Sequence, residues 1–104
     1  MLEHLNDSNF DQKISSSKVA MVDIFTSWCG PCRSMSPVVE KIAQEFDGKA
    51  LIGKLDADES SETAQKFMVR SVPTFLFFKD GQVVDKHIGS ISENDMRLKI
   101  NALL

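Results

Sequence analysis

Long apolar runs separated by polar, helix-like segments dominate the pattern of hydrophobic positions along this chain. The residues Val19–Phe25 are almost continuously apolar, which predicts a central strand buried on both faces. Residues 50–56 and 74–78 have the same character and predict two further buried strands. Leu2 and Leu5 indicate a short edge strand near the start. These strands form the expected centre of the molecule.

A hairpin is expected near the end of the chain. Residues 82–88 alternate between apolar and polar side chains, as a half-exposed antiparallel strand does. Asp80-Gly81, directly before them, is a dipeptide that favours a tight hairpin turn. This strand should therefore run antiparallel to residues 74–78.

Helical periodicity fills the gaps between the predicted strands. Apolar side chains recur every three or four residues as far as Phe46, which predicts an amphipathic helix that begins around the Cys29/Cys32 pair. Pro37 lies inside this helix and predicts a kink, and Gly48 suits a left-handed cap beyond its end. Shorter helices are expected, with Asp7 or Ser8, Ser60 or Ser61, and Ser92 at their starts.

The order of the predicted elements specifies a fold class. Strands and helices alternate at first, which predicts parallel pairing with crossover helices, while the late hairpin predicts an antiparallel pair. The chain is therefore expected to be an α/β protein. A central mixed sheet of four to five strands should be flanked by about four helices on its two faces. The length of 104 residues suits one domain over residues 1–104.

Composition narrows the class of protein further. Hydrophobic residues make up 42% and charged residues 26%, as in an ordinary soluble domain. The formal net charge of -3 argues against a nucleic-acid partner, because such proteins usually carry a basic patch. No secretory signal is visible, and no apolar run approaches the roughly 18 residues of a membrane span. We therefore expect a cytoplasmic protein, although an exported protein whose signal had been removed would look the same.

The segment Trp28-Cys29-Gly30-Pro31-Cys32 contains the two cysteines and the single tryptophan of the chain. Two cysteines at this spacing form either half of a zinc site or a redox pair. Zinc normally takes four ligands, and the two histidines, His4 and His87, lie far away in sequence. In the reducing cytosol a cysteine pair is more often catalytic than structural. The redox interpretation is therefore preferred, with no metal expected.

Thiol chemistry assigns different roles to the two cysteines. Cys29 should lie at the helix N-terminus, where free backbone N–H groups and the helix dipole favour negative charge and lower its pKa. It is therefore expected to be the exposed nucleophile that attacks a disulfide. Cys32, one turn later and shielded, is expected to resolve the mixed disulfide, and the two-residue spacing brings both sulfurs to bonding distance.

Two charged residues within predicted strands are candidates for proton transfer. Asp23 interrupts the apolar run, and a buried carboxylate is costly to ionise unless it is paired. It is expected to lie under the cysteine pair and accept the proton of Cys32; alternatively it lies at an edge in contact with water. Lys54 is either a surface lysine with a buried stem or a partner for the charge of Asp23.

Several further segments, spread over nearly the whole chain, accompany these residues. They are Val22-Asp23-Ile24-Phe25, Pro37, Lys54-Leu55-Asp56, Val69-Arg70-Ser71-Val72-Pro73-Thr74, Phe77-Phe78-Lys79-Asp80-Gly81 and Gly89. Together with the Cys29–Cys32 motif, this combination resembles the thioredoxin family. The departures are few: Phe25 stands where the family often has a second tryptophan, Thr26-Ser27 replaces a small and an acidic residue, and Ser36 replaces a common alanine.

The resemblance implies further features of the site. Pro73 should follow a cis peptide bond and lie against the cysteine pair. Gly30 and Pro31 should tune the redox potential, and the absence of a histidine between the cysteines favours a reductant. The substrate surface around the cysteines should consist of Trp28, Gly30, Pro31, Val72, Pro73 and Gly89. For Trp28, an ordinary core position is the alternative.

The expected function is therefore that of a protein-disulfide reductase acting in cell redox homeostasis. The resemblance implies that a flavoprotein, thioredoxin reductase, recharges it with electrons from NADPH, and that no cofactor is bound beyond the reversible disulfide. Disulfide-containing proteins are the expected partners of a monomer that contacts neither nucleic acid nor membrane. Two alternatives remain at this point: an oxidase or isomerase outside the cytosol, and a binding module within a larger complex.

Overall fold

The computed structural model describes residues 1–104 and contains one five-stranded mixed sheet in the order β1-β3-β2-β4-β5. β1, β2 and β3 are parallel, whereas β4 is antiparallel to both of its neighbours, β2 and β5. This confirms the predicted α/β fold class and its mixed sheet. The strands are β1 (Leu2–Leu5), β2 (Val19–Phe25), β3 (Leu51–Asp56), β4 (Thr74–Lys79) and β5 (Gln82–Ile88).

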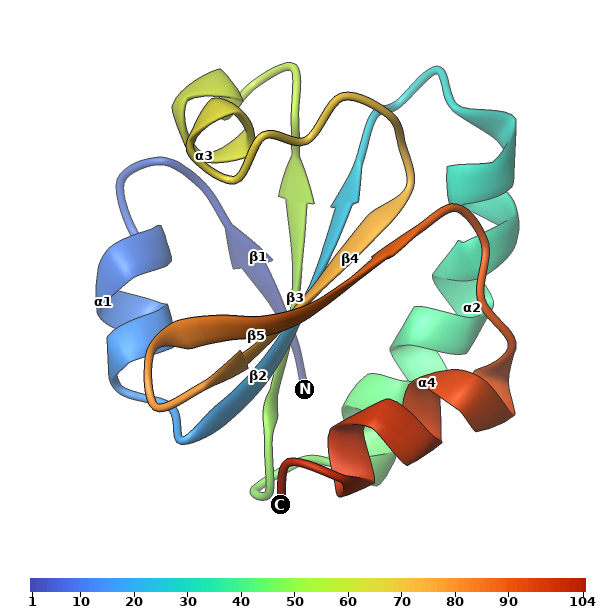
Figure 1. The fold of residues 1–104 in the computed structure, drawn as a ribbon. Coiled ribbons are helices and arrows are strands. Elements are labelled where there is room, and N and C mark those ends of the chain that lie inside the picture. The colour runs from blue at the N-terminus through green and yellow to red at the C-terminus, as the bar shows by residue number, and fades with distance from the viewer.

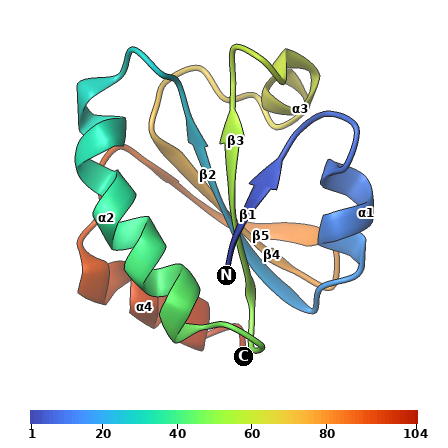
Figure 2. The same cartoon turned by 180° about the vertical axis from the view of Figure 1, so that it is seen from behind.

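Two helices cover each face of the sheet. Figures 1 and 2 show α1 (Phe10–Ser15) and α3 (Ser61–Lys66) on one side of the strands. The longer α2 (Gly30–Glu45) and α4 (Glu93–Asn101) lie on the other side. None of these helices is long and apolar enough to cross a membrane.

The central position of β2 explains its continuous apolar run. Successive side chains of a strand point to opposite faces, so Val19 and Met21 pack in the cluster under α2 and α4. Ala20 and Val22 belong to the second cluster, under α1. β4 is divided in the same way between the two clusters, and all of these side chains are buried. The expectation of strands buried on both faces is confirmed.

The start of α1 differs from the expectation. Its N-cap is Asn9, without a side-chain cap bond, and neither Asp7 nor Ser8 caps it. Asp7 instead reaches across to α3, where its Oδ1 accepts bonds from the Thr63 hydroxyl at 2.7 Å and backbone N–H at 2.9 Å. These bonds, chiefly that from the hydroxyl, hold the pKa of Asp7 below its usual range. The capping prediction failed because Asp7 has a long-range partner that local sequence does not show.

Other turns and caps follow the prediction. Ser92 caps α4, its hydroxyl oxygen accepting from the Asp95 N–H at 3.1 Å, and Ser60 is the N-cap of α3. Asp80 and Gly81 both have positive φ angles, 52° and 82°, as the two central residues of a type I′ hairpin turn require. Gly48 has a φ of 80° after the end of α2. Pro37 lies inside α2, and a kink there stays a prediction.

β5 is more exposed than a regular alternation predicts. It is an edge strand, and its register with β4 shifts between Phe77 and Phe78, which face Asp85 and Val83. Val84 is therefore the extra residue of a bulge and is half exposed. Because of the bulge and the edge position, β5 buries fewer of its side chains than the alternating sequence indicated.

The close approach of β1 to β3 requires a glycine. A Cβ atom at Gly53 would lie 2.6 Å from Cδ1 of Leu5, whose side chain is buried. We expect Gly53→Ala to lower the free energy of unfolding by about 1–3 kcal/mol, because it overpacks this contact. Urea denaturation measures the loss. In a Leu5→Ala background the same substitution should cost much less, and an equal cost in both backgrounds would show that the contact is not responsible.

Candidate active site

Cys29 and Cys32 lie where β2 passes into α2. Cys29 is the N-cap of α2, with Pro31 in the first turn, and its Sγ accepts from the Cys32 N–H at 3.1 Å. The two sulfurs form a disulfide, and the Cα atoms are 5.3 Å apart. A backbone N–H directed at Sγ would stabilise a thiolate after reduction. The expected helix-start position and bonding distance are thus observed.

The two cysteines differ less in exposure than expected. In this disulfide form Cys29 is 5% exposed and Cys32 is 3% exposed, so Cys29 is not the freely exposed sulfur that the sequence suggested. A surface hollow lies beside it. Cys29 nevertheless lines that hollow, whereas Cys32 does not. A substrate that approaches from the solvent therefore reaches Cys29 before Cys32.

The ligands that zinc would need do not come together. No group of three or more His, Cys, Asp or Glu side chains is arranged to hold a metal ion. Each cysteine is bonded to the other, and neither is free for a metal in this form. The arrangement therefore suits disulfide chemistry.

Asp23 is fully buried in β2. Its exposed fraction is 0%, and neither carboxylate oxygen has a hydrogen-bond partner. Burial raises the pKa of Asp23 from 3.8 to about 6, while the positive charge of Lys54 acts in the opposite direction. Asp23 shares its sheet face with Met21, which packs beneath α2. The alternative of a solvated edge position is wrong, and a carboxylate that exchanges its proton near neutral pH lies beneath the helix that carries Cys32.

Lys54 lies beside Asp23 without forming an ion pair with it. The two residues are register neighbours on β3 and β2, but their charged atoms are not within 4.0 Å. The Lys54 ammonium donates instead to the Ser36 hydroxyl at 3.3 Å and lies 4.5 Å from the centre of the Phe25 ring. The positive charge of Lys54 therefore acts on Asp23 without an ion pair, because the ammonium makes its direct contacts with Ser36 and Phe25.

Trp28 is a surface residue, and the alternative of a core aromatic is wrong. Its side chain is 67% exposed, and its Nε1–H donates to Asp58 at 2.9 Å. Sequence reasoning did not single out Asp58, since it belongs to an acidic loop that resembles any solvated surface. The contact depends on a loop that is about thirty residues away in sequence, so only the fold reveals it.

An open hollow of about 570 Å³ lies beside Cys29. Four of the six residues expected at the substrate surface line it, whereas Pro73 and Gly89 do not. Pro73 does follow a cis peptide bond, and the Val72 carbonyl oxygen is 3.8 Å from Cys29 Sγ. Gly89 adjoins Pro73 by donating its N–H to the Pro73 carbonyl at 2.8 Å. The lining residues are Thr26, Trp28, Cys29, Gly30, Pro31, Ala57, Asp58, Val69, Arg70, Ser71 and Val72.

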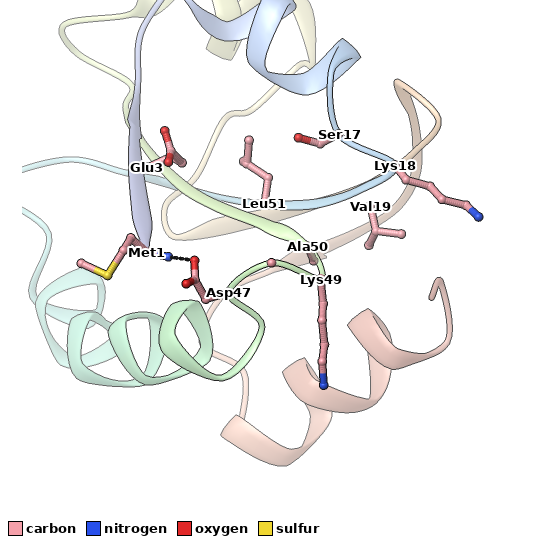
Figure 3. A pocket seen from close by; sticks show the side chains of 10 residues that line it. Met1, Glu3, Ser17, Lys18, Val19, Asp47, Lys49, Ala50 and Leu51 are labelled. Atoms are coloured by element: carbon pink, nitrogen blue, oxygen red, sulfur yellow. Dashed lines mark hydrogen bonds and ion pairs between the residues drawn. The ribbon is translucent and has the colours of Figure 1, made fainter.

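A second hollow, of about 580 Å³, lies at the opposite end of the parallel strands, where β2 and β3 begin. The N-terminal amine of Met1 and Asp47 form an ion pair across it (Figure 3). Figure 3 shows the side chains of Lys18 and Lys49 extending away from this hollow. It has no cysteine and no unpartnered buried polar atom, so the candidate site is the hollow beside Cys29.

Comparison with known proteins gives a consistent result. The Thioredoxin family model matches residues 1–102. The chain is 53% identical over 85 residues to a thioredoxin of Staphylococcus haemolyticus, covering 82% of this chain and 81% of that protein. It is 44% identical over 96 residues to thioredoxin 2 of Chlorobaculum tepidum, covering 91% and 88%. The solved structure of a mutant thioredoxin from Halobacterium salinarum superposes with a TM-score of 0.92 at 32% identity, covering 98% of this chain and 89% of that one.

Proposed function

Since the chain belongs to the thioredoxin family, we propose that it is a general protein-disulfide reductase in which the whole chain acts as one domain. The observation that carries this proposal is the Cys29–Cys32 disulfide at the start of α2, with Cys29 alone of the two lining an open hollow. When a reduced cysteine pair closes to a disulfide, it gives up two electrons, and these reduce the substrate. The intact pair disfavours a purely structural binding module.

The first step is attack by Cys29. After reduction, the Cys29 thiolate attacks one sulfur of a substrate disulfide, forms a mixed disulfide with it and displaces the other sulfur as a thiolate. The Cys32 N–H and the helix start stabilise the charge of Cys29 before the attack. The displaced thiolate takes its proton from water.

The second step releases the substrate. The Cys32 thiol gives its proton to the Asp23 carboxylate, and the resulting Cys32 thiolate attacks Cys29 Sγ. The Cys29–Cys32 disulfide forms, the bond between Cys29 and the substrate breaks, and the second substrate sulfur leaves as a thiolate. Two electrons have then passed from the cysteine pair to the substrate. With a pKa of about 6, Asp23 is mostly ionised at neutral pH and can accept a proton.

The oxidised pair must be reduced again before the next cycle. A flavoprotein reductase that takes electrons from NADPH is the proposed donor, as in the family to which the chain belongs. The proposed form is a monomer in the cytoplasm. Disulfide-containing proteins would contact the hollow, and an extended segment could pair with the backbone beside Val72.

An oxidase or isomerase is the second candidate function, and the Gly30-Pro31 spacer disfavours it. A histidine between the cysteines would favour the thiolate and so make the oxidised form a stronger oxidant. Equilibration of the protein with mixtures of reduced and oxidised glutathione separates the two. We expect the disulfide form to persist while glutathione is largely reduced, as befits a reductant. A pair that stays reduced under those conditions would indicate an oxidase.

Trp28 is expected to contribute to the binding of protein substrates and not to the chemistry of the cysteines. Trp28→Ala removes an exposed wall of the hollow, and truncating a central aromatic of an interface typically costs about 1–2 kcal/mol, or roughly tenfold in KM. Reduction of insulin should show this rise, while reduction of the small hydroxyethyl disulfide stays unchanged. Leu98→Ala is a matched control, because this α4 residue is 66% exposed outside the hollow. An equal loss with both substrates would place Trp28 in the chemistry.

A further inference from the structure

Ser36 occupies a junction between three parts of the site. It lies one turn after Cys32 in α2, and its hydroxyl donates to the Cys32 carbonyl at 3.4 Å. The same hydroxyl oxygen accepts from the Lys54 ammonium at 3.3 Å. A hydroxyl has one hydrogen to donate and lone pairs to accept with, so both bonds form together. Ser36 thus connects the helix that carries the cysteines to the strand beside Asp23.

The ammonium of Lys54 has two anchors, and Asp23 is not one of them. The Ser36 hydroxyl is one anchor, and the Phe25 ring, whose centre is 4.5 Å from Nζ, is the other. Phe25 lies two residues beyond Asp23 on β2, on the same face of the sheet. The anchors therefore hold the positive charge above Asp23, toward the cysteine end of the strands.

We propose that Ser36 is a positioning residue, which holds the Lys54 ammonium over the buried Asp23 carboxyl and so sets how readily Asp23 binds a proton. This inference rests on the proposed role of Asp23 in substrate release. In Ser36→Ala the Lys54 ammonium retains only its contact with the Phe25 ring. Lys54 is half-buried, whereas the Asp23 oxygens are enclosed, so the freed ammonium moves outward into water and not inward.

The direction of the effect follows from this movement. A positive charge near a carboxylate favours the ionised form and lowers its pKa. When the charge recedes, the pKa of Asp23 rises further above its ordinary value. The rise should be a fraction of that caused by Lys54→Met, because Phe25 still restrains the ammonium in Ser36→Ala.

Other charged groups on this face are farther along the sheet or have partners of their own. His87 on β5 lies beyond Phe75, and its Nε2 is 3.0 Å from the Ser90 carbonyl oxygen. Cys32 of α2 is in the disulfide. The remaining groups are His4 of β1, which is the register neighbour of Lys54, Asp56 at the end of β3, Asp85 of β5 paired with Lys99 of α4, Arg97 of α4 paired with Glu45 and Glu93, and Arg33 bonded to the Ser27 carbonyl.

The test is an NMR titration of the Asp23 carboxyl carbon in the disulfide form, in which neither cysteine titrates. We expect the Asp23 titration to move to higher pH in Ser36→Ala. Ser34→Ala is the matched control, because the Ser34 hydroxyl bonds only to the Gly30 carbonyl of its own helix and to no lysine. Ser34→Ala should titrate as the wild type does.

A double-variant comparison makes the inference specific. In a Lys54→Met background, Ser36→Ala should produce no further shift, since there is no ammonium to position. An undiminished shift in that background, a shift to lower pH, or no difference between Ser36→Ala and Ser34→Ala would each overturn the proposal.

The pH dependence of mixed-disulfide release separates this inference from the proposed function. If Asp23 accepts the Cys32 proton, the midpoint of the release rate should move with the Asp23 titration in Ser36→Ala. A moved titration with an unmoved rate profile would leave Ser36 as the positioning residue and would remove Asp23 from the release step.

Discussion

Replacement of Cys29 by serine is expected to reduce the reduction of insulin disulfides to the uncatalysed background. A serine hydroxyl is not ionised near neutral pH and cannot form a disulfide, so the first attack is lost outright. The remaining Cys32 is 3% exposed and does not line the hollow, so it cannot take over the role. Activity with dithiothreitol as the electron donor measures the loss and leaves any reductase out of the assay.

Cys32→Ser is the comparison for this result. It keeps the attacking sulfur but lacks the resolving one, so multiple turnover should also fall to background. Circular dichroism of both variants should show the fold intact, because each serine replaces one sulfur with one oxygen at the same helix start. Turnover by Cys29→Ser near the wild-type level would contradict the proposed mechanism.

Asp23→Asn is expected to stabilise the fold by roughly 3 kcal/mol at neutral pH. The carboxyl is fully buried without a hydrogen-bond partner, and its pKa is raised from 3.8 to about 6. One pKa unit corresponds to about 1.4 kcal/mol, so ionising Asp23 in the folded state carries roughly this penalty. An amide in the same place is also unpaired but carries no charge, and its burial costs less.

The stabilisation by Asp23→Asn should depend on pH with a definite sign. Below the ordinary carboxyl pKa of 3.8, Asp23 is protonated in both states and imposes no ionisation penalty. Between 3.8 and about 6 the folded state binds more protons than the unfolded state, so the stability of the wild type falls as the pH rises. Above about 6 the penalty is complete and the difference between the two proteins is constant.

Urea denaturation of both proteins from pH 3.5 to 8 measures this difference. Asp85→Asn is a matched control of the opposite sign, because the Lys99 hydrogen bond holds the pKa of Asp85 below its usual range. That substitution should not stabilise the protein at neutral pH. Equal stability of wild type and Asp23→Asn at neutral pH would contradict the buried position of the carboxyl.

The parts of the fold that sequence predicts well depend on patterns repeated over many residues. The strand Val19–Phe25 has a nearly continuous apolar run, the helix that begins around the Cys29/Cys32 pair has a long 3.6-residue period, and both elements are present. Burial of Asp23 was the preferred expectation because the residue stands within an apolar run, and the structure decides it against the solvated edge position. The fold class followed from the order of these elements.

Contacts that depend on a single distant partner were not predictable in the same way. Asp7 precedes a helix but bonds to Thr63 on another one, and Trp28 bonds to Asp58. A place beside Asp23 was one of two expectations for Lys54; the strand register puts it there, yet its hydrogen bond goes to Ser36. A short polar side chain has several possible acceptors or donors, and only the packing of the elements determines which one it meets.

The central claim, that Cys29 attacks first and Cys32 resolves, is tested most directly by trapping the mixed disulfide. The reduced Cys32→Ser and Cys29→Ser variants are each mixed with a disulfide-bonded protein, and intact mass spectrometry with peptide mapping locates any adduct. The account predicts a stable adduct on Cys29 in Cys32→Ser and none in Cys29→Ser. A stable adduct on Cys32 in Cys29→Ser, with none on Cys29 in the other variant, would contradict it.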